Sequence, residues 1–291
     1  MKSMTLEKLI LFSGMLLAVV SSATQNCLSQ EAKKPTPEEI IASHLESIGT
    51  PGARSAFKSV VAQGTVTVNV RIGGSGKGTG GAVVASQGPM SLMGFIFGPQ
   101  EYANEKMAFN GQKLTLGEAR PGVRTRFGDF LMTHDVLFRE GLLGGTLSTA
   151  WPFYNANEPK GKLRYQGTKN VNDRKAYILG YEPRSGSNLE IKLYFDAETF
   201  QHLRTEYQQE FVAPSVSRPE KAARQKGTRL KLTEDFSDFR REANLVLPHN
   251  YKIQLTIDSE SDPLLQDWVV TLSKFLFNKS LDAKQFDLAA Q

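Results

Sequence analysis

The sequence NLEIKLYFDAETFQHLRTEYQQEF, residues 188–211, alternates apolar with polar side chains in two runs that are separated by a turn. Alternation with a period of two is typical of a half-buried β-strand. Asp196 favours the turn, because an Asp side chain can bond to the backbone two residues later. On the return strand, one side is expected to carry Leu203, Thr205, Tyr207 and Phe211. A two-stranded ribbon is not stable alone, so this hairpin predicts a larger sheet around it.

The same alternation recurs on both sides of the hairpin. Valines 66, 68 and 70 alternate with polar residues, and the run from Tyr251 to Ile257 does the same. Asn110-Gly111 separates two further runs and is a strong signal for a tight hairpin. Strands are therefore expected between residues 60 and 116 and between residues 162 and 278. Roughly eleven strands joined by short turns predict a large antiparallel sheet of the α+β class in one domain, residues 37–291.

Two segments have helical spacing instead. Thr36 is expected to cap a helix that begins at Pro37 and stops at Gly49. In the second segment, Gly141 is a natural stop for a helix whose apolar face carries Phe130, Leu131, His134, Leu137 and Phe138. A glycine-jointed apolar stretch, residues 142–153, follows it. This segment predicts a lid whose apolar side faces the sheet and whose glycines permit hinge motion. A plain pair of core-covering helices is the alternative.

The first 23 residues are typical of a secretory signal peptide. Lys2 and Lys8 precede the apolar run LILFSGMLLAVV, and small residues follow it. That run is short for a membrane span, which leaves a single-pass anchor as the weaker alternative. Residues 24–36 are expected to form a flexible linker. Cys27 is preceded by Thr-Gln-Asn, a poor lipidation signal, so a lipoprotein anchored through Cys27 is the alternative to a free periplasmic protein.

Composition and motifs do not point to catalysis or to a cofactor. The formal net charge of +5 over 291 residues is too small to indicate a nucleic-acid partner, although it permits peripheral contact with a membrane. Cys27 is the only cysteine, and the four histidines, His44, His134, His202 and His249, show no metal-ligand spacing. Residues 76–81 satisfy G-x-G-x-x-G, but an apolar β run follows instead of a helix, so we interpret residues 73–81 as a hairpin turn. We therefore expect no enzyme, no metal and no cofactor.

A curved sheet roofed by short helices makes a concave apolar pocket, which is the usual form of a lipid-binding site. The strands supply candidate wall residues for such a cavity: Val66, Val68, Phe95, Phe97, Leu193, Phe195, Ile253 and Leu255. The helical segment supplies candidate lid residues: Leu131, Leu137, Phe138, Leu142, Leu143 and Trp151. The sequence leaves open whether these side chains surround a cavity or a solid core.

Several short patterns resemble the LolA/LolB-like family of outer-membrane lipoprotein-sorting proteins. They are LYFDAET (193–199) with Leu203-Arg204, FSDFR (236–240), LPH (247–249), and the final segment from Phe277 to Phe286. The resemblance implies an unclosed β-barrel with a helical lid and an apolar cavity for acyl chains. It also implies a basic residue that holds the lid closed, although no arginine of this sequence can be assigned that role. The longer helical insert and the extended loop 212–227 depart from the family pattern.

Two functions follow as hypotheses. The first is a periplasmic carrier that binds the acyl chains of lipoproteins or lipids reversibly and without covalent chemistry. The second is a regulatory or sensor protein of the envelope, with the same fold, that acts through a protein partner and its loop 212–227. An enzyme would need a polar cluster inside the cavity that the sequence does not reveal.

Overall fold

The computed structural model describes residues 34–98, 102–154, 161–211 and 227–290. The account below concerns the compact unit Pro35–Gln291. The predicted signal peptide, nearly all of the predicted linker, Cys27 and most of the loop 212–227 lie outside the described residues.

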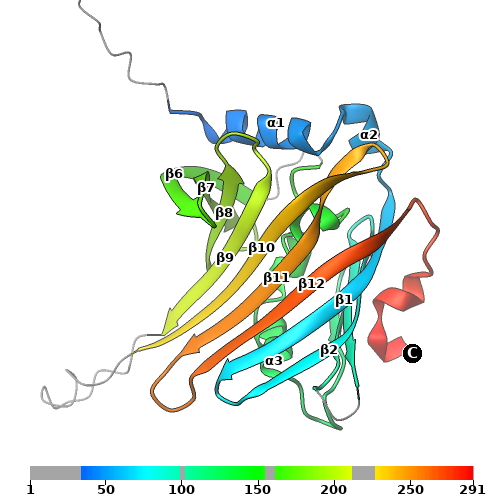
Figure 1. Cartoon of the computed structure of the whole chain (residues 1–291), viewed down its shortest axis with the longest axis vertical. Coiled ribbons are helices and arrows are strands. Elements are labelled where there is room, and N and C mark those ends of the chain that lie inside the picture. Colours follow the sequence, from blue (N-terminus) through cyan, green and yellow to red (C-terminus); the bar gives the residue numbers. More distant parts are fainter. Residues whose placement is uncertain (1–33, 99–101, 155–160, 212–226, 291) are drawn as a thin grey trace, which may run out of the picture. The chain divides into compact units, whose positions relative to one another are not determined.

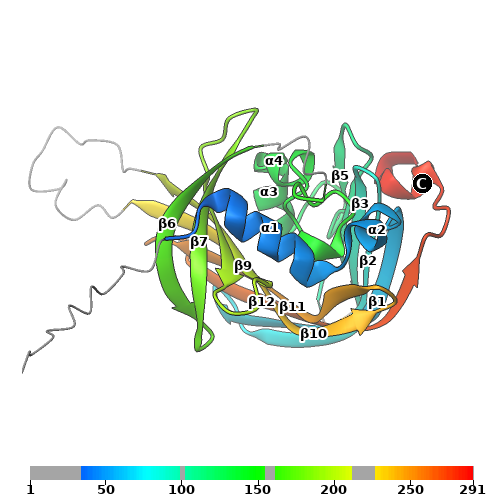
Figure 2. The same ribbon diagram turned by 90° about the horizontal axis from the view of Figure 1, so that it is seen from above.

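One antiparallel sheet of twelve strands forms the unit, in the order β5-β4-β3-β2-β1-β12-β11-β10-β9-β8-β7-β6. Two runs of neighbouring strands, β1–β5 and β6–β12, meet where β1 pairs with β12 (Figure 1). The sheet is open, with β5 at one edge and β6 at the other (Figure 2). The strands are β1 (Ser59–Ile72), β2 (Gly76–Gln87), β3 (Met90–Phe97), β4 (Glu105–Phe109), β5 (Leu114–Leu116), β6 (Gly161–Val171), β7 (Arg174–Pro183), β8 (Glu190–Asp196), β9 (His202–Phe211), β10 (Thr228–Glu242), β11 (Leu245–Asp258) and β12 (Leu264–Phe277). The predicted α+β class and open antiparallel sheet are confirmed, with twelve strands where about eleven were expected.

The sheet curves around a set of short helices. Figure 2 shows α1 (Pro37–Ile48) crossing the concave side, with α3 (Arg126–Thr133) and α4 (Val136–Arg139) lying within the curve. A short helix α2 (Pro51–Ser55) follows α1, and 3-10 turns form at η1 (Gly145–Leu147), η2 (Ala283–Phe286) and η3 (Leu288–Ala290). The structure therefore places a helical cover, residues 126–154, against the inside of the sheet, and we call this segment the lid.

The start of α1 follows the prediction. The Thr36 hydroxyl accepts a hydrogen bond from the Glu39 backbone N–H at 3.2 Å, and the Glu39 carboxylate accepts one from the Thr36 N–H at 2.8 Å. This reciprocal capping box satisfies backbone donors that would otherwise lack partners in the first turn. Pro37 occupies the first helical position, where its missing N–H is harmless.

The sequence predicts one helix that carries residues 130–138 and ends at Gly141, and this prediction is wrong. The chain leaves helical geometry at His134 (φ −123°, ψ 48°), and two short helices, α3 and α4, stand on either side of it. The apolar spacing did not reveal this break, because Leu131 before it and Leu137 after it are both fully buried.

Two further local expectations need correction. The glycine-rich segment is mostly strand: β2 begins at Gly76, and a Cβ at Gly80 would lie only 2.0 Å from the carbonyl oxygen of Ile96, so a glycine is required for the close approach of β3. Leu203 does not share a face with Tyr207. A register shift between Tyr194 and Phe195 turns Leu203 to the other side of the sheet, where it packs against Tyr194.

Candidate functional site

The concave face of the sheet carries the predicted wall residues. Val66, Phe95, Leu193, Phe195, Ile253 and Leu255 are 0% exposed, Val68 is 1% exposed and Phe97 is 6% exposed. The six predicted lid residues are also buried, the most accessible being Leu143 at 7%. Wall and lid residues belong to one continuous apolar cluster. The structure therefore brings together all fourteen side chains that the sequence nominated.

In this conformation lid side chains pack closely against part of the concave face. Where Phe138 and Leu143 of the lid meet Val84 and Met93 of the sheet, the remaining space measures about 10 Å³. Protein interiors pack to the density of organic crystals, and a contact of this kind is a packed core rather than an open cavity. At this contact, an acyl chain could reach Val84 and Met93 only after the lid had moved.

A buried carboxylate of the sheet accepts a hydrogen bond from the lid. Glu234 of β10 is 0% exposed, and its carboxylate accepts hydrogen bonds from the Gly144 backbone N–H at 2.8 Å, from the Tyr207 hydroxyl at 2.7 Å and from the Tyr251 hydroxyl. Gly144 has a φ of +81°, a left-handed conformation that favours glycine. Burial raises the pKa of Glu234 to about 7, because a charged carboxylate is poorly solvated there.

A buried histidine makes the second connection. The His44 ring of α1 bonds through Nδ1 to the Phe200 carbonyl at 2.9 Å, and its Nε2 accepts a hydrogen bond from the indole N–H of Trp151 in the lid at 3.1 Å. The carbonyl requires a proton on Nδ1, so Nε2 carries the lone pair that the indole needs. His202 stacks on the Trp151 ring, with ring centres 4.7 Å apart. The interpretation of His44 as a packed histidine rather than a metal ligand agrees with these contacts.

The third connection lies beside the edge of the sheet. The Tyr181 hydroxyl of β7 donates a hydrogen bond to the Glu140 carboxylate, which follows α4, at 2.6 Å, and both side chains are buried. We call the three contacts Glu234–Gly144, His44–Trp151 and Tyr181–Glu140 the lid latches. Each is worth about 1 kcal/mol, or somewhat more where a charged group takes part.

An arginine also bridges the lid and the sheet, but at the surface. Arg126 of α3 pairs with Asp262, which lies between β11 and β12, and both side chains are about half exposed. Exposed ion pairs contribute roughly 0–1 kcal/mol because water and salt screen them. Arg126 is therefore a weak attachment of the lid, whereas buried attachments come from Glu234, His44 and Tyr181.

Sequence reasoning missed the lid latches, but one of them left a signal. Leu232, Glu234 and Phe236 occupy successive inward positions of β10, so Glu234 interrupts an apolar face with a carboxylate. The other two latches join residues that are far apart in the sequence, His44 with Trp151 and Tyr181 with Glu140, so no local pattern predicts them. Only the curvature of the sheet brings those partners together.

The protonation state of His44 predicts how the latch depends on pH. Burial lowers the pKa of His44 from 6.5 to about 4, so in the folded protein the ring stays neutral until the pH falls near that value. The unfolded chain binds this proton at higher pH, so the stability from His44 is complete above about pH 6.5 and is lost as the pH falls through about 4, by roughly 3 kcal/mol. Urea titrations of wild type and His44→Gln should therefore show that the advantage of the wild type shrinks between about pH 7.5 and about pH 4.5. A constant difference would contradict a neutral His44, because the other buried histidines are common to both proteins.

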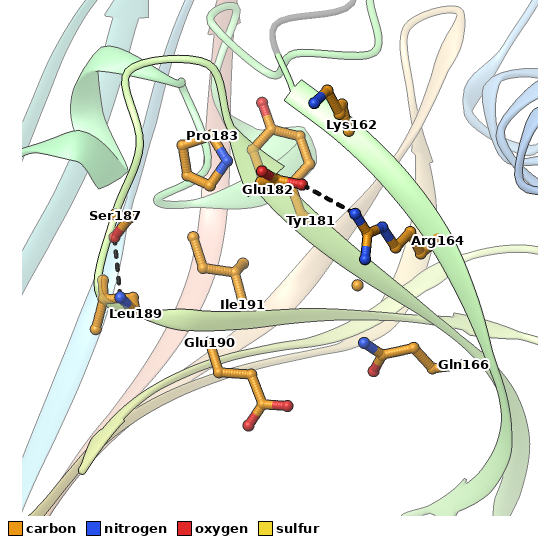
Figure 3. A pocket seen from close by; sticks show the side chains of 11 residues that line it. Lys162, Arg164, Gln166, Tyr181, Glu182, Pro183, Ser187, Leu189, Glu190 and Ile191 are labelled. Atoms are coloured by element: carbon orange, nitrogen blue, oxygen red, sulfur yellow. Dashed lines mark hydrogen bonds and ion pairs between the residues drawn. The ribbon is translucent and has the colours of Figure 1, made fainter.

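A separate pocket of about 190 Å³ lies on strands β6, β7 and β8 (Figure 3). Its rim carries an exposed ion pair between Arg164 and Glu182 at 3.5 Å, and the Ser187 hydroxyl accepts a hydrogen bond from the Leu189 N–H at 3.0 Å. Tyr181, which forms a lid latch, also lines this pocket. The pocket is small.

Fold and site together define an open antiparallel half-barrel with an apolar concave face and a latched helical lid. In the described ranges, no helix has the length and apolar character needed to cross a membrane. No protein-family profile matches the sequence. No curated protein matches it either.

Three solved structures are similar to this chain. The first is a LolA superfamily protein from Nitrosomonas europaea, with 11% identity, coverage of 89% of this chain and 100% of that one, and a TM-score of 0.44. The second is a DUF1329 family protein from Desulfovibrio piger, with 11% identity, coverage of 88% and 99%, and a TM-score of 0.43. The third is a putative outer membrane lipoprotein-sorting protein domain from Vibrio parahaemolyticus, with 10% identity, coverage of 84% and 95%, and a TM-score of 0.39. Two of the three carry names from the family that the sequence resembles.

Proposed function

We propose that this protein is a carrier that binds the acyl chains of lipids or lipoproteins on the concave face of its sheet, beneath the lid. One observation carries the proposal: a glycine-jointed lid, held by few hydrogen bonds, places six apolar side chains on a wall of eight more. These lid side chains occupy the place that an acyl chain would take. Binding would exchange one apolar contact for another and would need no covalent step.

The energies are compatible with reversible binding. Burying an acyl chain yields about 0.8 kcal/mol for each CH₂ group. Two further hydrogen bonds join the lid to the sheet: the Thr149 N–H donates to Ser86 Oγ at 2.8 Å, and its hydroxyl donates to the Gly88 carbonyl at 2.9 Å. Breaking these two bonds and the three lid latches costs about 1 kcal/mol each, or somewhat more. A chain of several CH₂ groups therefore offsets the latches, and the lid can close again on its own side chains when the cargo leaves.

The location belongs to the same proposal. A signal peptide at residues 1–23 would deliver the protein to the periplasm, where the cargo would be lipid or lipoprotein and no catalytic step would occur. Lipidation of Cys27 would instead anchor the protein to a membrane. Mass measurement of the purified mature protein distinguishes the two, because an attached lipid adds mass and removes the free thiol.

Native mass spectrometry of protein purified from its own compartment, followed by solvent extraction, tests the carrier. We expect bound acyl lipid or an acylated peptide that leaves on extraction. A bare protein mass, together with no uptake of a fluorescent fatty-acid probe, would contradict the proposal. Deleting residues 212–227 separates the two hypotheses: a carrier should keep its lipid binding, whereas a regulatory protein should lose its partner.

A further inference from the structure

The two edges of the sheet differ in length and in what lies beside them. β5 has three residues, and the C-terminal turns η2 and η3 lie against β3, β4 and β5, with the Leu288 N–H donating to the Thr115 hydroxyl at 2.9 Å. β6 has eleven residues, and within the described ranges no strand lies on its outer side (Figure 2). An open edge presents backbone N–H and C=O groups that can pair with another strand. β6 is therefore the edge at which the sheet can grow.

The first part of β6 is a regular strand. Its pairing with β7 runs without a shift from Gly161, opposite Pro183, to Tyr165, opposite Leu179. A register shift follows between Tyr165 and Gly167, whose φ is +105°. Such a bulge bends a strand and interrupts its ladder. An added strand therefore finds a regular edge along residues 161–165.

This stretch carries two different rows of side chains. Leu163 and Tyr165 are partly buried and pack against the apolar cluster of the concave face. Lys162 and Arg164 alternate with them, so they point to the other face, where both are exposed. Apolar pairs and pairs of opposite charge stabilise neighbouring strands. The edge therefore fits a segment in which apolar side chains alternate with side chains that suit a cation.

The charge of this edge indicates what the second kind of side chain is. Residues 161–183, which form β6, β7 and their turn, carry five basic and two acidic residues. Arg174 pairs with the Asp196 carboxylate at 2.7 Å, whereas Lys162, Lys169 and Lys175 form no ion pair with any described residue. These unpaired cations favour a partner with acidic side chains.

The pocket on β6, β7 and β8 lies beside this stretch (Figure 3). Lys162 and Arg164 line it, together with two acidic residues, Glu182 and Glu190. Glu182 pairs with Arg164 at 3.5 Å and Glu190 pairs with Lys192 at 2.7 Å, so Lys162 is the charged lining residue without an ion pair in the described part of the chain. In strand addition, pockets beside a sheet edge give specificity for particular side chains. Lys162 is placed to bind a carboxylate of the added strand.

We infer that β6 is a docking edge for an extended acidic segment of another protein, which pairs with residues 161–165 as an additional strand. Its apolar side chains lie beside Leu163 and Tyr165, and its carboxylates lie beside Lys162 and Arg164. A second copy of this chain is disfavoured, because two β6 edges would bring the same cations together. Residues 212–226 are disfavoured for the same reason, since they carry four basic residues and one acidic residue. The inference does not rest on the carrier proposal.

Fluorescence anisotropy with two labelled peptides, EVEIEVE and KVKIKVK, tests the charge preference. We expect EVEIEVE to bind at least about tenfold more tightly than KVKIKVK at low salt. Its binding should weaken as salt is added, because salt screens the charges. Equal binding of the two peptides, or no binding of EVEIEVE at about 1 mM, overturns the inference.

Backbone methylation distinguishes strand addition from simple attraction between charges. Along an edge strand, alternate residues direct their backbone N–H groups to the neighbouring strand. EVEIEVE is therefore made with N-methyl groups on its odd-numbered residues and, separately, on its even-numbered residues. We expect one version to lose at least about tenfold in affinity and the other to stay within about threefold of the parent peptide. Equal affinities of the two versions would show that the peptide does not pair as a strand.

Charge reversal in β6 tests the location. Lys162→Glu with Arg164→Glu should reverse the preference, so that KVKIKVK binds more tightly than EVEIEVE. The matched control, Lys106→Glu with Lys274→Glu, makes the same change in net charge at two exposed positions of β4 and β12, and it should keep the wild-type preference. Circular dichroism checks the fold of both proteins. A wild-type preference in the folded β6 variant, or loss of the preference in the control, overturns the location.

Hydrogen exchange on the wild type locates the peptide without any variant. Bound EVEIEVE should slow amide exchange in residues 161–165 and leave residues 114–116 of β5 unchanged. Slower exchange at β5 alone, or at neither edge while the peptide is bound, overturns the inference. These results are independent of whether native mass spectrometry recovers acyl cargo, so a failure of this inference is distinguishable from a failure of the carrier proposal.

Discussion

Replacing Glu234 with leucine is expected to lower the free energy of unfolding by roughly 3–5 kcal/mol and to loosen the lid. The hydroxyls of Tyr207 and Tyr251 and the N–H of Gly144 all donate to this carboxylate in a fully buried place. Leucine leaves these donors without an acceptor and without water. Denaturant titrations measure the loss of stability, and hydrogen exchange at residues 142–147 measures the loosening of the lid.

Glu234→Gln is the matched control, since it keeps the shape and one acceptor oxygen. We expect it to lie within about 1.5 kcal/mol of the wild type near pH 7. Its pH dependence is informative, because the pKa of Glu234 is raised from 4.5 to about 7 in the folded protein. The stability from this raised pKa is complete below about pH 4.5 and is lost as the pH rises to about 7, so Glu234→Gln should gain on the wild type by up to roughly 3 kcal/mol between these two pH values and then stay level. If leucine and glutamine behaved alike, the carboxylate would not be the attachment that we describe.

The double variant Leu142→Asp with Leu143→Asp should abolish uptake of a fatty-acid probe while the sheet stays folded. Leu142 is 0% exposed and Leu143 is 7% exposed, and both belong to the cluster between lid and wall. An ionised carboxylate buried without a partner is disfavoured by several kcal/mol, so the lid cannot settle on the sheet. The sheet is held by its own ladders, and its circular dichroism should remain.

The control for this variant introduces two Asp side chains at exposed positions in or near the lid. Val123→Asp with Met132→Asp alters two side chains that are 53% and 38% exposed, and it should leave uptake within about twofold of the wild type. Normal uptake by a folded Leu142→Asp, Leu143→Asp protein would remove the lid from the binding mechanism.

Much of this fold could be predicted from the sequence, because local patterns of residues determine its strands and helices. The alternation in residues 189–195 and 251–257 gave strands, the Thr36-Pro37 pair gave the start of a helix, and apolar residues gave the two sides of the core. The interactions that close the lid could not be predicted in the same way. Trp151 meets His44 across more than a hundred positions, and a one-residue register shift beside Phe195 decides which neighbour faces inward.

The candidate site, too, could be predicted only where local sequence patterns determine it. Alternation identifies Leu255 as an inward side chain, but it cannot show whether the space in front of that side chain is filled or open. The filling depends on the break at His134, which sets the course of the lid and leaves one imidazole nitrogen without a hydrogen-bond partner among the described residues. Neither the helix break nor the unpaired nitrogen produces a periodic pattern in the sequence.

The pairing of β1 with β12 has a consequence for the order of folding. Val66 of β1 lies opposite Val270 of β12, so the first strand of the chain pairs with the last one. Each run of neighbouring strands, β1–β5 and β6–β12, can assemble from short-range contacts, whereas their union must close a loop of about two hundred residues, and such non-local contacts form slowly. Until the last strand arrives, β1 presents an unpaired edge, and a chain shortened at its C-terminus would keep that edge exposed to other strands.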